Sequence, residues 1–119
     1  HPRLRGGCIE QGAMWVPSFL RRLDTVLRSF GKTEPTIAGL ELTPSENAHR
    51  QLWFTPFVGE DVGWLIDQCG DDLFLFSSDY PHPEGGRDPV ARFEETMDVV
   101  SDAARDRFYE ANYAEMMGF

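Results

Sequence analysis

The chain has 119 residues, of which 41% are hydrophobic and 26% charged, a balance typical of globular domains and not of disordered segments. Its formal net charge of −9 argues against nucleic acid or an anionic membrane as a partner, because both attract basic surfaces. Its apolar runs are too short to cross a bilayer, and its length allows one domain but not a complete α/β barrel.

The first predicted elements are a short strand and a long helix. Residues 6–10 form the strand, which ends in the polar cluster Glu10-Gln11-Gly12. A helix follows over about residues 14–30, because apolar side chains recur there at steps of three and four, and Gly31 ends it. Residues 32–42 carry no periodic pattern, and we interpret them as a surface loop.

The middle of the chain repeats this order. In Thr43-Pro44-Ser45-Glu46, a threonine N-cap precedes a proline and is followed three residues later by glutamate, which predicts a capping box and a short helix to about residue 50. Residues 51–57 form the second predicted strand. Residues 61–69 form a helix with one apolar face, closed by Gly70.

The last part begins with the apolar run LFLF at residues 73–76, typical of a strand buried on both faces of a parallel sheet. A polar turn follows at residues 77–83. Asp88-Pro89 then starts a helix that runs to about residue 100, and Ser101 caps a last helical segment to about residue 116. The sequence therefore predicts an α/β fold in the order βαβαβα, with parallel strands and right-handed crossovers.

The two cysteines fall in a predicted strand and on a predicted helix face. Cys8 and Cys69 have no CxxC spacing, and we interpret them as small buried apolar residues in a reducing, cytoplasmic compartment. A disulfide between them stays open as an alternative. No leader segment is expected, and the start at His1 leads us to expect a piece of a longer protein.

Candidate functional residues follow the predicted strands, because parallel α/β folds collect their sites beyond the carboxyl ends of the strands. Asp79 follows the buried strand in a turn that contains Pro81 and Pro83, so its carboxylate is a candidate for metal binding or proton transfer. His82, three residues later, is a candidate for the same site. The alternative is that Asp79 only caps a turn and His82 faces solvent.

Three segments resemble the amidohydrolase-related branch of the amidohydrolase superfamily, which includes aminocarboxymuconate-semialdehyde decarboxylase. They are HPRLR…EQGAMWVP…LD within residues 1–24, WFTPF at residues 53–57 and LFSSDYPHPEG at residues 75–85. The resemblance spans nearly the whole chain. It implies that residues 1–119 are the C-terminal fragment of a single barrel domain, a partial (β/α)8 TIM barrel made of strands six to eight and their helices.

The resemblance also implies roles for single residues. Asp79 matches the strand-eight aspartate, which in this family binds the divalent metal or takes the proton of its water; zinc is the expected metal and manganese the alternative. Glu10 is a further candidate catalytic residue, or else a strand-end carboxylate bonded to backbone amides. His82 and Trp15 are candidates for substrate binding, although an aromatic residue such as Trp15 can equally belong to the core.

Two departures from the family pattern bear on function. The usual His-x-His or Glu-x-His pair of strand one and the histidine of strand five have no counterpart here, and Glu10-Gln11 stands where decarboxylases have a histidine. We therefore expect the parent to be a metal-dependent hydrolase of a small carboxylate, lactone or amide-like substrate. The alternatives are a metal-dependent decarboxylase of the same superfamily and a non-catalytic acidic α/β interaction fragment.

Two expectations concern the isolated chain. A three-stranded arc has two open strand edges and an apolar inner face, so we expect association with the remainder of the barrel or with a second copy. We also expect Pro81 and Pro83 to keep Asp79 and His82 from sharing one ion, and Glu10 to lie two strands away. The chain alone is therefore expected to be inactive and to bind no metal tightly.

Overall fold

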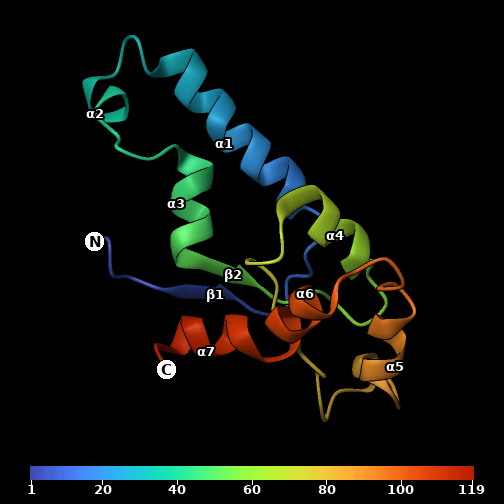
Figure 1. The fold of residues 1–119 in the computed structure, drawn as a ribbon. Helices are drawn as coiled ribbons and strands as arrows, with labels where there is room; N and C mark the ends of the chain where they lie inside the picture. Colours follow the sequence, from blue (N-terminus) through green and yellow to red (C-terminus); the bar gives the residue numbers. More distant parts are fainter.

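The computed structural model describes residues 1–119 and contains a small parallel sheet surrounded by helices (Figure 1). Strands β1 (Gly6–Cys8) and β2 (Leu52–Phe54) pair in parallel, with Gly7 opposite Trp53. A third segment, residues 73–76, joins β2 through a parallel bridge between Phe54 and Phe74. The prediction of an α/β fold with parallel neighbours in chain order is confirmed, whereas a closed barrel would need strands beyond these three.

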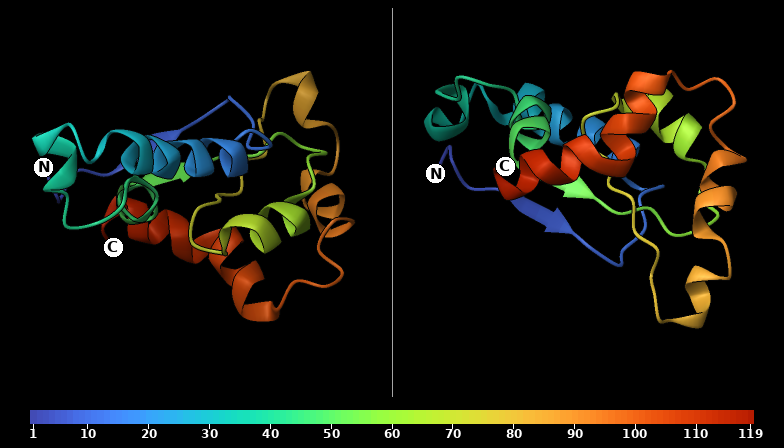
Figure 2. Two further views of the ribbon diagram at one scale, coloured as in Figure 1. Left: turned by 90° about the horizontal axis from the view of Figure 1, so that it is seen from above. Right: turned by 60° about the horizontal axis from the view of Figure 1, so that its bottom comes forward.

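Helices connect these segments and cover the sheet. The α-helices are α1 (Val16–Phe30), α2 (Pro35–Ala38), α3 (Pro44–Gln51), α4 (Val62–Cys69), α5 (Pro89–Glu94), α6 (Asp102–Asp106) and α7 (Asn112–Met117). A 3-10 turn occupies Pro83–Gly85, and a π-helical turn at Arg107–Ala111 joins α6 to α7. Helix α1 packs against α3 and α4, and α7 lies beside β2. Helices α2 and α5 lie at opposite ends of an elongated molecule of 51 × 28 × 27 Å (Figure 2).

Local capping explains where most helices begin. At α3 the Thr43 hydroxyl accepts the Glu46 amide (3.3 Å), and the Glu46 carboxylate accepts the Thr43 amide (2.7 Å), which confirms the capping box. Asp61, Asp88 and Ser101 cap α4, α5 and α6 in the same way, each by accepting a backbone N–H three residues on.

Several predicted boundaries are wrong, each for a physical reason. Strand β2 spans only residues 52–54, because α3 runs through Gln51 and Pro56 has no N–H to donate. The predicted loop at residues 32–42 contains α2, which starts at Pro35. Helix α5 stops at Glu94, well before residue 100, because the chain turns there toward α4. A Cβ on Gly63 of α4 would overlap the carbonyl oxygen of Thr96 in that turn.

The third predicted strand is reduced to a bridge because Pro56, the next residue after Phe54 that would face it, has no N–H to donate. The C-terminal helix takes its far edge. Asn112 donates to the carbonyl of Phe74 (2.9 Å), and the Phe76 amide donates to the carbonyl of Phe108 (2.9 Å) in the π-helical turn. A π-turn shifts the hydrogen-bond ladder of a helix and leaves a carbonyl free for such a contact. Both outer edges of the sheet are expected from the sequence to be open. That expectation is wrong for the edge at the third segment, which the C-terminal helix covers, whereas the edge at β1 has no neighbouring strand.

The core lies between the sheet and the helices. Phe93 and Phe108 are buried in it with their ring centroids 5.2 Å apart, and Phe76 packs 5.8 Å from Phe93. Cys8 and Cys69 are free thiols, which gives the disulfide alternative no support, and both are half-buried, not fully buried as predicted. Burial raises the pKa of the Cys69 thiol. None of the helices has the length and apolar character that a membrane span requires.

Candidate metal centre

Two of the predicted site residues lie where the chain leaves the sheet, and both have unusual backbone conformations. Glu10 follows β1 with φ 58°, and Asp79 follows the third segment with φ 57°. Positive φ is uncommon for residues other than glycine, and it is maintained only where surrounding contacts hold the backbone in place. Both residues therefore end their extended segments abruptly.

His82 is brought back onto Asp79 by a tight turn. Its backbone N–H donates to the carbonyl of Asp79 at 2.7 Å, and the Tyr80 amide donates to the Ser78 hydroxyl at 3.3 Å. The 3-10 turn at Pro83–Gly85 follows directly. This turn places the imidazole of His82 beside the carboxylate of Asp79.

The side chains of Glu10, Asp79 and His82 form one cluster. His82 Nδ1 lies 3.3 Å from Asp79 Oδ1 and 3.4 Å from Glu10 Oε1, and one ligand atom from each residue lies within 4.8 Å of the other two. The side chain of Asp79 is 23% exposed, against 62% for Glu10 and 59% for His82. The cluster borders a cavity of about 570 Å³ that is also lined by Ile9, Gln11, Phe57, Val58 and Glu84.

The expectation that these three side chains stay apart is therefore wrong. Pro81 and Pro83 do not hold the turn open, because the amide of His82 closes it onto the carbonyl of Asp79. Glu10 does come from two strands away, about 10 Å at the usual strand spacing. That gap is closed because Glu10 and His82 have long side chains and β2, between them, ends early at Phe54.

The donor set of this cluster fits a divalent cation. At metal–ligand distances of about 2.0–2.2 Å, neighbouring ligands around a tetrahedral ion lie roughly 3.4 Å apart. The two separations from His82 Nδ1 match this spacing. Two carboxylates and one imidazole suit zinc or manganese. These residues are thus able to occupy three positions of a metal site whose solvent side stays open.

Trp15 does not line this cavity, although it contacts Gln11, which does. Its indole N–H donates to the carbonyls of Gly12 (3.0 Å) and Gln11 (3.2 Å), and its ring packs edge-on against Phe19 and Phe54. The residues that line the cavity do not include Trp15. Trp15 is 39% exposed and so is not a core residue, and its role in substrate binding stays a prediction.

Two residues at the end of β2 were not identified from the sequence. Thr55 is buried, and its hydroxyl accepts the backbone N–H of Glu10 at 3.2 Å. The carboxylate of Glu60 accepts the N–H of Ala13 at 2.7 Å and that of Phe57 at 3.0 Å. The sequence places Thr55 within the second predicted strand, residues 51–57, and Glu60 shortly after it, but their contacts with the loop after β1 depend on tertiary structure.

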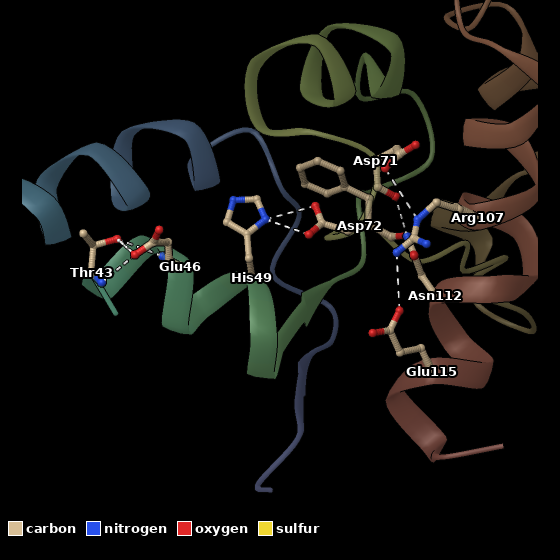
Figure 3. Close-up of polar contacts among 9 residues, drawn as sticks. Thr43, Glu46, His49, Asp71, Asp72, Arg107, Asn112 and Glu115 are labelled. Atoms are coloured by element: carbon tan, nitrogen blue, oxygen red, sulfur yellow. Dashed lines mark hydrogen bonds and ion pairs between the residues drawn. The ribbon is translucent and has the colours of Figure 1, made fainter. Parts of the chain in front are cut away.

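A second polar cluster lies apart from the cavity (Figure 3). His49 Nδ1 lies 3.0 and 2.9 Å from the two carboxylate oxygens of Asp72, and Arg107 lies between Asp71 and Glu115. The hydrogen bond to Asp72 raises the pKa of His49. Burial alone would raise the pKa of Asp72, but His49 and Arg107 lower it overall. This cluster joins α3, the third segment and the C-terminal helix.

Comparison with known proteins gives similarity to solved structures only. No protein-family model and no curated protein matches the sequence. The structure is similar to the crystal structure of an amidohydrolase from Mycobacterium avium subsp. paratuberculosis K-10, with a TM-score of 0.80 and 27% sequence identity. The match covers 99% of this chain and 29% of that chain. The chain is thus amidohydrolase-like, and it spans less than a third of the length of that neighbour.

Proposed function

We propose that this amidohydrolase-like chain supplies part of the metal site of a metal-dependent hydrolase. The observation that carries the proposal is the convergence of Glu10, Asp79 and His82 where the parallel segments end. The similarity to a solved amidohydrolase over 99% of the chain supports the same origin. We assign residues 1–119 to the last three β/α units of a (β/α)8 barrel of the decarboxylase-related branch, on the motifs that resemble it.

We assign the roles of the three cluster residues from how exposed their side chains are. A bound divalent ion, zinc first and manganese second, would lower the pKa of a water molecule and polarise a substrate oxygen. Asp79 is the least exposed of the three ligands, and it binds the ion or accepts the proton of the water. Glu10 and His82 flank it at the open side of the cavity.

The substrate is proposed to be a small carboxylate, lactone or amide-like molecule. A cavity of about 570 Å³ is within the size range of small-molecule sites. Hydrolysis is favoured over decarboxylation because Glu10 stands where the decarboxylases that the chain resembles have a histidine. Decarboxylation by a related parent is the second candidate.

The test is calorimetric titration of the chain with Zn²⁺ and with Mn²⁺. Three donors, two of them exposed, should bind one ion more weakly than about 1 μM, equivalent to about 8 kcal/mol, so that exhaustive dialysis removes it. Glu10→Gln, Asp79→Asn and His82→Ala should each weaken binding at least about tenfold, or about 1.4 kcal/mol. His49→Ala is the matched control, since His49 also faces a carboxylate but lies outside the cavity.

Two results would contradict this proposal. Equal binding by the wild type and the three cluster variants would place the ion elsewhere. Absence of any binding would favour the non-catalytic acidic interaction fragment. Retention of one ion per chain through dialysis would instead show that the site is complete without the rest of the barrel.

A further inference from the structure

The loop after β1 is held by side chains from the end of β2. Glu10 begins this loop, and its backbone N–H donates to the hydroxyl of buried Thr55 at 3.2 Å. Three residues later, the N–H of Ala13 donates to the carboxylate of Glu60 at 2.7 Å. The first and last residues of the Glu10 loop are therefore both bonded to the neighbouring strand end.

Glu60 joins two loops through a single oxygen atom. Its Oε2 accepts the amide of Ala13 from the loop after β1 and the amide of Phe57 from the loop after β2. Gly12 lies against the same side chain at φ 61°, and a Cβ there would come within 2.7 Å of both Glu60 Oε1 and Phe57 Cδ2. The two loops are therefore in close contact, with the carboxylate of Glu60 between them.

Glu10 has few contacts of its own that could hold it. Its side chain is 62% exposed and meets His82 at 3.4 Å, and its positive φ is a conformation that an unrestrained glutamate rarely adopts. The orientation of its carboxylate toward Asp79 and His82 thus depends on the bonds made by its backbone and by the loop that follows it.

We propose that Glu60 is a positioning residue of the metal site: by bonding Ala13 and Phe57 it joins the two loops and fixes Glu10 against Asp79 and His82. The proposal rests on the metal site described above. Glu60 does not line the cavity, so it acts through Glu10 and not on the ion. Thr55 supports the same loop at its other end.

The first arm of the test needs no metal. Backbone NMR of the metal-free chain reports the φ angle of Glu10 through its HN–Hα coupling and the protection of the Ala13 amide from hydrogen exchange. Glu60→Ala should abolish the left-handed signature of Glu10 and the protection of Ala13, whereas Glu60→Gln, which keeps an acceptor oxygen, should restore most of both. Glu46→Ala is the matched control, because it also removes a carboxylate that accepts a backbone amide, but in α3.

The second arm measures Zn²⁺ and Mn²⁺ affinity in a double-mutant cycle. Glu60→Ala should weaken binding about tenfold in the wild-type background. It should have no further effect in the Glu10→Gln background, because both changes remove the same ligand. If Glu60→Ala fails to fold, Thr55→Val takes its place, because it keeps the side-chain volume and removes the hydroxyl. It should weaken metal binding in the wild-type background and have no further effect in the Glu10→Gln background.

The two arms separate the two proposals. Additive losses in the cycle, or an unchanged Glu10 signature in metal-free Glu60→Ala, would overturn the positioning role. Loss of the Glu10 signature in a chain that binds no ion would support the loop-positioning step and overturn the metal site.

Discussion

At the scale of single residues, the backbone conformation of Asp79 decides where its carboxylate lies. Its positive φ and the turn that returns His82 to it fix the carboxylate at the end of a buried segment, with 23% of the side chain exposed. Replacement by asparagine keeps the size of the side chain and removes its negative charge. The proposed role of Asp79 in catalysis can therefore be tested separately from its role in the turn.

We expect Asp79→Asn in the intact parent to lower turnover by about 10²–10⁴-fold, the usual cost of removing a catalytic acid or base. Folding should remain close to wild type, since no hydrogen bond within the core depends on this carboxylate. Steady-state kinetics, with thermal unfolding measured in parallel, would check both. A variant with near-normal turnover would return Asp79 to the role of a turn residue.

At the scale of elements, the polar cluster around Asp72 holds α3 against the segment that leads into the third strand. His49 is the last-turn histidine of α3 and contacts both oxygens of Asp72. The surrounding charges are Asp71, Arg107 and Glu115. The stability that this contact contributes depends on pH, because the pKa of His49 is raised and the pKa of Asp72 is lowered.

The raised pKa of His49 means that its contribution is fully present below pH 6.5 and is lost as the pH rises through the raised value. The lowered pKa of Asp72 means that its contribution is present above pH 3.8 and is lost as the pH falls through the lowered value. The pair should therefore stabilise the fold most between pH 3.8 and 6.5. Both side chains are about one-third exposed, so the effect should not exceed about 1 kcal/mol.

Urea unfolding of the wild type and of His49→Gln, on either side of the histidine pKa, measures this contribution. The difference between the two proteins should be largest in mildly acid buffer and shrink in alkaline buffer. A difference that is constant, or that grows with pH, would show that the ion pair has no part in the pH dependence.

At the scale of the whole molecule, the sheet is asymmetric. The far edge of the third segment is taken by Asn112 and by the carbonyl of Phe108, whereas β1 has no neighbouring strand on its other side. Apolar side chains near β1, such as Leu4 and Ile9, are exposed. An exposed strand edge beside apolar side chains favours pairing with another chain.

We therefore expect the isolated chain to associate through β1, with a second copy or with the remainder of the barrel. Sedimentation velocity at micromolar concentration should show a dimer or a reversible equilibrium. Gly7→Pro would remove a strand N–H and should shift the chain to the monomer, whereas the same change at Gly39, outside the sheet, should not. A stable folded monomer of the wild type would contradict this expectation.

The sequence by itself determined the features that depend on near neighbours in the chain. The capping box at Thr43, the caps at Asp61, Asp88 and Ser101, and the strand–helix alternation all follow from interactions within a few residues, and the structure contains them. The position of Asp79 at the end of a buried apolar run was predictable for the same reason.

Only the tertiary structure decided which of these groups meet. The early end of α5 depends on Gly63, and the covered far edge of the third strand depends on Asn112; both contact residues far along the chain. The approach of Glu10 to His82 depends on a short β2 and on loops joined through Glu60, and no local pattern encodes either. Short-range hydrogen bonds can be read along a chain, whereas contacts between residues far apart in the sequence exist only once the core has packed.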